Sequence, residues 1–233
     1  TQALGMTDVS RRRHHETFHR FFSRGSWSPD RIGHLLFKCI TRLVPGAVIH
    51  AAVDDTLAAK KGPNVFGLGC HLDAVRSTRS VRVFCFGHVW VVVAIIVRLP
   101  FSNRPWALPV LFRLYRNKKE CLGKGHPYRK KTELARELVD ILVTWSGDRR
   151  IHLAVDSAYC NDTLMRGLPP AVVVFGAIRP DAVLTALPVE GGRRRVGRRR
   201  VRGKVLPKPA ALAKSEHHPW KRCQAELYGR RRT

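Results

Sequence analysis

The chain has 233 residues, of which 44% are hydrophobic, and it carries 43 Lys and Arg against 17 Asp and Glu, a formal net charge of +26 at pH 7. The hydrophobic content is sufficient for a folded core, which excludes wholesale disorder. So large a positive charge predicts polyanionic partners. Nucleic acid fits better than a membrane, because the longest apolar run, residues 89–97, is about half as long as a membrane helix needs. We therefore expect a nucleic-acid partner and no membrane-spanning segment.

The cysteines and the start of the sequence bear on the compartment. The six cysteines are scattered, and no two have the C-x-x-C spacing of a zinc site. The sequence does not open with a charged segment followed by an apolar one, so no signal peptide is recognised. These features favour a reducing compartment and predict a cytoplasmic protein.

The first 46 residues predict a small helical region. Three phenylalanines at helical spacing indicate a helix over residues 9–22. A second helix is predicted from Ser28, a good N-cap residue, and Pro29, which suits the first helical position. A continuous apolar stripe follows and ends at the Pro-Gly pair of residues 45–46.

The middle of the chain predicts strands. An apolar run over residues 48–53 is the first of them. Residues 80–99 are rich in β-branched side chains and predict one long strand or two, with residues 86–88 as the break. Residues 104–115 predict a strand in an edge or bulged position, because two prolines remove backbone donors. A basic loop is predicted over residues 118–131.

Helices and strands alternate in the next part of the sequence. A helix is predicted over residues 133–145, a strand over 151–155, a short helix over 161–166 and a strand over 171–178. Strands that come first and then alternate with helices predict an α/β fold, a mixed sheet with helices on its faces. The basic residues 193–204 lie between Gly and Pro and predict a mobile loop.

Aspartates follow two of the predicted strands. Asp54 and Asp55 end the first apolar run, and Asp156 ends the run over residues 151–155. Ligands of open α/β sheets bind outside the carboxyl ends of the strands, and carboxylates there can hold Mg²⁺ or Mn²⁺ for phosphodiester hydrolysis. Because side chains alternate along a strand, only one of the two adjacent aspartates can share a site with Asp156. Spacing alone leaves open a second interpretation, in which each aspartate only caps the turn after its strand.

Basic side chains are the second candidate group. They could neutralise backbone phosphates and give salt-sensitive, largely sequence-independent affinity for DNA, although solvated charge is the simpler interpretation of any single run. The candidate DNA-binding residues are Lys60, Lys61, Arg76, Arg113, Lys130, Lys131, Arg193, Arg194, Arg195, Arg198, Arg199 and Arg200. The histidines show no metal-ligand spacing, although His71 and Asp73 follow the first strand soon enough to lie near the candidate site.

Several blocks together resemble one family, the DDE transposases of bacterial insertion sequences, in their DDE superfamily endonuclease branch. The blocks are VDDTLAAKKG at residues 53–62, HLDAVRST at 71–78, FGHVWV at 86–91, RPWALPVL at 104–111 and AVDSAY at 154–159. The likeness extends to the N-terminal helical region and covers nearly the whole chain.

The resemblance implies a fold and a site. The fold is a ribonuclease-H-like mixed sheet with flanking helices over residues 47–180, preceded by the helical region 1–46. Residues 181–233 would begin a basic, β-rich and partly disordered insertion. The resemblance implies Asp55 and Asp156 as the catalytic and metal-binding residues, with Mg²⁺ or Mn²⁺ as cofactor.

The implied function is that of a transposase, which cuts DNA at transposon ends and joins them to target DNA in the bacterial nucleoid. A dimer in the DNA complex is compatible with it. The third acidic ligand of the family is a glutamate on a helix downstream of the insertion. Glu216 and Glu226 lie in the stretch that resembles the insertion, and neither is assigned that role. We therefore expect a C-terminally truncated fragment that binds metal weakly and does not catalyse alone.

Two other functions stay open at this point. A basic DNA- or RNA-binding protein without catalysis would show the same net charge, and so would a degenerate transposase remnant that folds poorly. Metal-dependent cleavage of DNA discriminates between an enzyme and either alternative.

Overall fold

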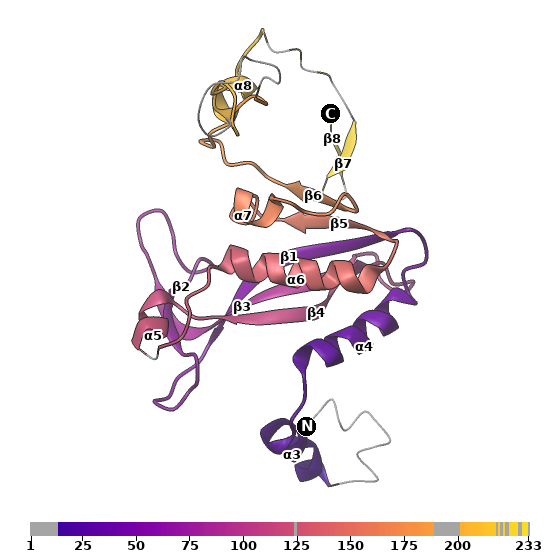
Figure 1. Ribbon diagram of the computed structural model, residues 1–233, viewed down its shortest axis with the longest axis vertical. Helices are drawn as coiled ribbons and strands as arrows, with labels where there is room; N and C mark the ends of the chain where they lie inside the picture. Colours follow the sequence, from indigo (N-terminus) through magenta and orange to yellow (C-terminus); the bar gives the residue numbers. More distant parts are fainter. Residues whose placement is uncertain are drawn as a thin grey trace, which may run out of the picture. The chain divides into compact units, whose positions relative to one another are not determined.

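A computed structural model describes residues 14–123, 125–188, 201–217, 219, 221, 224–227 and 230–232. The chain divides into two compact units, residues 1–176 and 177–233. Figure 1 shows the course of the chain and the helices and strands of each unit. The predicted boundaries after residues 46 and 180 stay predictions.

Among the described residues, two helices precede the first strand. Helix α3 spans His15–Arg24 and helix α4 spans Pro29–Thr41. The hydroxyl of Ser28 accepts a hydrogen bond from the backbone N–H of Arg31, which confirms Ser28 as the N-cap of α4. The helix predicted over residues 9–22 is found a few residues later in the chain, and residues 9–13 lie outside the described part.

A six-stranded mixed sheet forms the centre of the first unit. Its order is β2-β3-β1-β5-β6, with β4 also paired to β3. Strand β3 pairs antiparallel with β1, β2 and β4, whereas β5 runs parallel to both β1 and β6. The predicted mixed sheet is therefore confirmed. The strands are β1 Val48–Ala59, β2 Gly69–Leu72, β3 Phe84–Val97, β4 Trp106–Tyr115, β5 Arg150–Val155 and β6 Val172–Gly176.

Strand β3 continues without a break through Gly87, where a division into two strands was one of the predicted options. A side chain at Gly87 would place its Cβ 2.4 Å from the Ala58 carbonyl oxygen, so the glycine permits the close approach of β1. On the other strand pair, the register shifts between Val93 and Ala94, where Pro109 lies in β4. The bulged position predicted for this proline-containing strand is confirmed.

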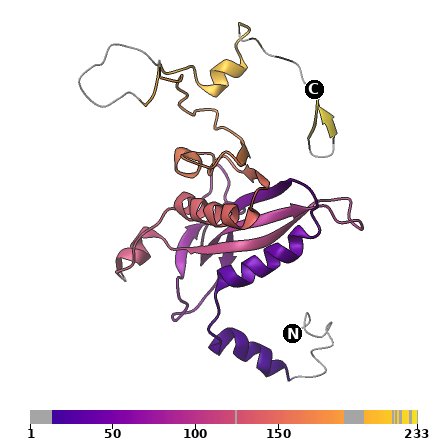
Figure 2. The ribbon, with the colours of Figure 1, turned by 45° about the vertical axis from the view of Figure 1, so that its right-hand side comes forward.

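Helix α6, Lys131–Ser146, lies across one face of the sheet (Figures 1 and 2). Its apolar stripe packs on the side chains that β1, β3 and β5 direct to the same face, and burying each large aliphatic side chain stabilises the fold by about 2 kcal/mol. Fully buried members of this core include Ile49, Val53, Val91, Val93, Ile95, Leu138, Leu142, Ile151 and Leu153. Helix α4 joins the same core through Phe37 and Ile40.

Part of the predicted basic loop over residues 118–131 is helical. Helix α5 spans Lys118–Gly123 and buries Cys121. The backbone N–H of Glu120 donates to the side-chain oxygen of Asn117, so the helix begins at a local cap that charge counting did not reveal. The loop prediction is wrong for these residues.

The other described elements are short. Helix α7, Asp162–Met165, follows β5 and confirms the short helix predicted there. In the second unit, helix α8 spans Pro209–Ala213, and strands β7, Ala225–Leu227, and β8, Arg230–Arg232, form an antiparallel pair. Among the described helices, none has the length and apolar character needed to cross a membrane.

Candidate active site

The parallel pairing of β1 and β5 brings the predicted carboxylates to one place in the sheet. The last register pair of these strands is Val53 with Val155. Asp156 follows Val155 directly, and Asp55 lies two residues beyond Val53. Two side chains about a hundred residues apart in sequence are thereby gathered where β5 ends.

The prediction that Asp54 and Asp55 close their own strand is wrong. Strand β1 continues to Ala59, because it keeps its antiparallel pairing with β3 from Asp55 opposite Val91 to Ala59 opposite Gly87. The strand end that positions the site is therefore that of β5. This difference arises from pairing with a distant strand, which the apolar run of β1 does not reveal.

The two adjacent aspartates lie on opposite faces of β1, as strand geometry requires. Asp54 is exposed, whereas Asp55 is partly buried on the face that also carries the buried Val53. Asp55 is therefore the aspartate on the side covered by α6. The backbone N–H of Asp55 donates to Oδ1 of Asp54 at 2.8 Å, which orients the exposed carboxylate.

Both carboxylate oxygens of Asp55 have a partner. The hydroxyl of Tyr159 donates to Oδ1 at 2.8 Å, and the ammonium of Lys131 lies 2.7 Å from Oδ2. Tyr159 is buried and comes from the turn after β5, while Lys131 is the first residue of α6. The ammonium also lies 5.5 Å from the ring centroid of Tyr115. Asp55 is thus fixed from two elements that follow it by 76 and 104 residues.

Asp156 organises the turn that carries Tyr159. Its Oδ1 accepts hydrogen bonds from the backbone N–H groups of Ala158 and Tyr159, each at 3.0 Å. The interpretation of this aspartate as a turn cap is therefore confirmed for one of its oxygens. Capping by Oδ1 does not prevent metal binding, because a carboxylate has four lone-pair positions.

The pKa of Tyr159 reports the charge of the site. Burial raises the pKa of this hydroxyl above its ordinary value, and the hydrogen bond to Asp55 raises it further. The negative charges of Asp55, Asp54 and Asp156 add to the same effect. One hydroxyl is therefore within electrostatic reach of all three carboxylates that the sequence singled out.

His71, in β2, lies at the margin of this group. It is buried, and its Nε2 has no hydrogen-bond partner within the described residues. Burial lowers the pKa of His71, and the positive charge of Lys131 lowers it further, whereas the charges of Glu120 and Asp55 act in the opposite sense. The interactions with Lys131 and Asp55 agree with the prediction that His71 lies near the site.

The donor set suits a hard divalent cation. Carboxylate oxygens are the ligands of Mg²⁺ and Mn²⁺, and Mg²⁺ commonly uses only one or two protein carboxylates together with waters and substrate phosphates. Asp55 and Asp156 match that requirement in type and number. Over the described part of the chain, no group of three or more His, Cys, Asp or Glu side chains is arranged to hold a metal ion.

Comparison with known proteins decides the family. A family model described as DDE superfamily endonuclease matches residues 3–232, which is nearly the whole chain. The chain belongs to the DDE superfamily endonucleases. Searches of curated proteins and of solved structures gave no match. The family assignment confirms the resemblance found in the sequence, and with the mixed sheet it confirms the ribonuclease-H-like fold class.

Membership of an endonuclease family makes DNA the substrate of this protein. Of the basic residues predicted to contact DNA, Lys60, Lys61, Arg76 and Lys130 are exposed. Lys60 and Lys61 directly follow β1, the strand that carries Asp55. The arginines predicted between residues 193 and 200 lie outside the described residues.

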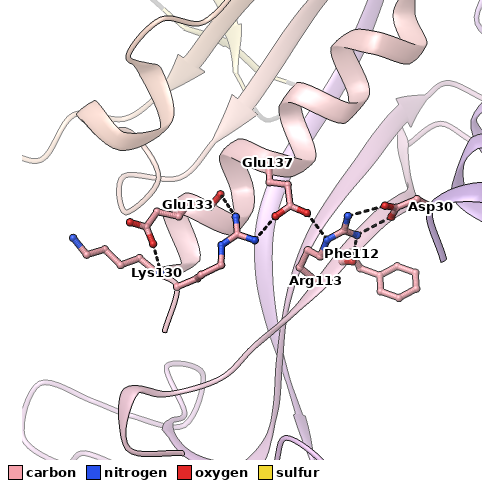
Figure 3. Close-up of polar contacts among 7 residues, drawn as sticks. Asp30, Phe112, Arg113, Lys130, Glu133 and Glu137 are labelled. Atoms are coloured by element: carbon pink, nitrogen blue, oxygen red, sulfur yellow. Dashed lines mark hydrogen bonds and ion pairs between the residues drawn. The ribbon is translucent and has the colours of Figure 1, made fainter. Parts of the chain in front are cut away.

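In this DDE endonuclease, the side chain of Arg113 forms ion pairs with Asp30 and Glu137. Its guanidinium donates two hydrogen bonds to Asp30, at 2.7 and 2.8 Å, and one to Glu137 at 2.8 Å (Figure 3). Arg129 donates to the other oxygen of Glu137. The network joins α4, β4 and α6, so a structural role for Arg113 is observed, and its role in DNA binding stays a prediction.

The pKa values in this network agree with its geometry. The hydrogen bonds to Asp30 raise the pKa of Arg113 against the opposing effect of burial. Burial alone would raise the pKa of Glu137, but the hydrogen bonds from Arg129 and Arg113 outweigh it, and the pKa of Glu137 is lowered.

Sequence reasoning missed one residue of the candidate site and one contact. Tyr159 stands in the AVDSAY block, three residues after Asp156, yet it received no role. Its position three residues after Asp156 could have indicated this role, because a side chain in the turn after one strand can reach the neighbouring strand. Lys131 was predicted to contact DNA, but its ion pair with Asp55 depends on the fold and had no signal in the sequence.

Proposed function

We propose that this DDE endonuclease is a transposase, which cleaves DNA at the ends of a mobile element and joins the ends to target DNA. Asp55 and Asp156 would hold Mg²⁺ or Mn²⁺ at the end of β5. The observation that carries the proposal is the register of β1 and β5, which aligns Val53 with Val155 and so gathers the two carboxylates. The carboxyl end of a strand at the centre of an α/β sheet is a usual place for a ligand.

Each residue of the site has a defined part in the proposal. Asp55 and Asp156 supply hard oxygen ligands, and Tyr159 orients Asp55 through a hydrogen bond of 2.8 Å. Bound Mg²⁺ or Mn²⁺ would supply the Lewis acidity that activates the attacking water and stabilises the charge developing on the phosphate. After cleavage, the 3′-hydroxyl at the transposon end is the nucleophile that attacks a phosphodiester of the target.

The basic surface supports a DNA partner for the same site. Lys60 and Lys61 are exposed at the end of β1, and Arg76 is exposed in the connection between β2 and β3. These side chains would position the DNA backbone beside the carboxylates, without reading base sequence. The proposal places the reaction in the bacterial nucleoid, with a dimer as the arrangement that pairs two ends.

The test is cleavage of DNA that carries the ends of the element. The complete product of the gene is incubated with Mg²⁺ and with a fragment that includes the DNA flanking the gene. Asp55→Asn and Asp156→Asn are each expected to lower the cleavage rate at least about a hundredfold, because each removes an anionic ligand. Asp54→Asn is the matched control, and it is expected to retain most of the activity because Asp54 lies on the other face of β1.

Undiminished cleavage by Asp55→Asn or Asp156→Asn would show that the site assignment is wrong. A second candidate function is a basic nucleic-acid-binding protein without catalysis, which the formal net charge of +26 favours. That function is supported if the gene product binds the DNA, loses affinity steeply with added salt and never cleaves it in Mg²⁺ or Mn²⁺.

A further inference from the structure

The ammonium of Lys131 forms an ion pair with Asp55, a proposed metal ligand. The ammonium lies 2.7 Å from Oδ2 of Asp55, and the hydroxyl of Tyr159 lies 2.8 Å from Oδ1. Both oxygens of the carboxylate are therefore already bound by donors of the protein. A divalent ion that enters the site must share or displace one of these partners.

We propose that Lys131 competes with the divalent metal for Asp55, so that metal binding releases its ammonium to bind a phosphate of the DNA substrate. This inference rests on the proposed role of Asp55 as a metal ligand. It assigns to Lys131 a positioning role in the metal-free protein and a substrate-binding role in the metal-bound protein.

Distance and charge support the competition between Lys131 and the metal for Asp55. Mg²⁺ binds a carboxylate oxygen at about 2.1 Å, so an ion on Oδ2 and an ammonium on the same oxygen would be no more than about 5 Å apart. Both are cations, and the side chains of Lys131 and Asp55 are only 37% and 25% exposed, so water screens their repulsion incompletely. The metal and the ammonium therefore oppose each other at this carboxylate.

The position of Lys131 in α6 supports the binding of a phosphate by the released ammonium. It is the first residue of the helix, where the macrodipole disfavours a positive side chain. The ion pair with Asp55 compensates for that placement, as does the ring of Tyr115, whose centroid lies 5.5 Å from the ammonium. If a metal binds Asp55, the flexible lysine loses this anion, and a phosphate beside the site can replace it.

The test measures affinity for Mn²⁺ by electron paramagnetic resonance or calorimetry, in the absence of DNA. Lys131→Met is expected to bind Mn²⁺ about tenfold more tightly than the wild type, because a partly buried ion pair no longer has to be broken. Lys131→Arg keeps the positive charge and is expected to bind no more tightly than the wild type. Thermal unfolding of each variant verifies that it is folded.

Lys130→Met is the matched control. It removes the same charge one residue earlier, but the hydrogen bond that ties Lys130 to the start of α6 comes from its backbone N–H to Glu133 (Figure 3). Its side chain is exposed. Its affinity for Mn²⁺ is expected to stay within about twofold of the wild type, since exposed charges are well screened.

The outcomes separate this inference from the proposed function. If Asp55→Asn abolishes Mn²⁺ binding but Lys131→Met binds Mn²⁺ no more tightly than the wild type, competition by Lys131 is overturned and the metal role of Asp55 stands. If Asp55→Asn binds Mn²⁺ as well as the wild type, the proposed metal role of Asp55 fails, and the inference fails with it. Tighter binding by Lys131→Met and Lys130→Met alike would mean that net charge, rather than the ion pair, sets the affinity.

Discussion

The hydroxyl of Tyr159 lies 2.8 Å from Oδ1 of Asp55 and links the turn after β5 to the middle of β1. The bond joins two segments whose strands are parallel neighbours. Its acceptor is Asp55, although Asp156 is much closer to Tyr159 in sequence. Asp156 instead holds the backbone of the turn from which Tyr159 projects. The second aspartate therefore orients the first through a tyrosine.

Tyr159→Phe is expected to lower the free energy of unfolding by about 1 kcal/mol, because it removes a charge-assisted hydrogen bond from a partly exposed carboxylate and keeps the buried ring. Urea denaturation at pH 7 measures the change. Tyr128→Phe is the control, since the Tyr128 hydroxyl pairs with that of Tyr115 at 3.5 Å near the surface. A loss for Tyr159→Phe no larger than that for Tyr128→Phe would show that the bond contributes little.

Local signals in the sequence were sufficient for the elements that depend on local chemistry. Helix α4 was predicted from the cap at Ser28, the proline after it and the apolar stripe that follows. The β-branched run gave β3, and Pro109 marked the irregular pairing of β4. These features are set by capping, side-chain branching and missing backbone donors, all of which are read within a few residues.

The structural features that could not be predicted from the sequence depend on pairing between distant segments. Strand β1 extends past Asp55 because β3 pairs with it there, and no apolar pattern signals that extension. The prediction that Asp55 and Asp156 share one site depends on the family resemblance, since spacing alone also allows two unrelated turn caps. The ion pair of Lys131 with Asp55 depends on where α6 begins over the sheet, which only the fold determines.

Arg113→Met is expected to destabilise the protein by about 2 kcal/mol, a value between those of exposed and buried ion pairs. The change leaves Asp30 without its two hydrogen bonds and Glu137 with Arg129 as its remaining arginine partner. The free energy of unfolding in urea is the measurement. Arg98→Met removes an exposed arginine near the end of β3 and is expected to change stability by less than about 0.5 kcal/mol.

If Arg113→Met proves as stable as Arg98→Met, the network of Figure 3 does not contribute to folding. Arg113 would then be available for the role in DNA binding that the sequence suggested. Measured affinity for nonspecific duplex DNA distinguishes the two roles, because loss of a phosphate contact also reduces the salt dependence of binding.

Gly33→Ala is expected to destabilise the protein by about 1 to 3 kcal/mol, although alanine normally stabilises the interior of a helix. The added Cβ would lie 2.1 Å from the carbonyl oxygen of Val110, so α4 would have to move away from β4. Gly123→Ala, in α5, is the control, because its Cβ would meet nothing within 4 Å. Thermal unfolding should show a lower midpoint for Gly33→Ala and an unchanged or higher one for Gly123→Ala.

His71 should make stability depend on pH. Its pKa is lowered in the folded protein, first by burial and then by the charge of Lys131, so between that lowered pKa and about 6.5 the unfolded chain binds more protons. The stability contributed by neutral His71 is complete above about pH 6.5 and is lost as the pH falls towards and through the folded pKa. The unpaired Nε2 fits this sign, since protonation there would bury an N–H without a partner.

The measurement is the free energy of unfolding in urea at pH 7.5 and pH 5.5. His71→Gln cannot take up a proton in this range, so the difference between the two pH values is expected to be smaller in this variant than in the wild type. The exposed His126 provides the control, and His126→Gln is expected to keep the wild-type difference. If His71→Gln shows the same loss at pH 5.5 as the wild type, the acid sensitivity originates in other groups, and burial of His71 does not control it.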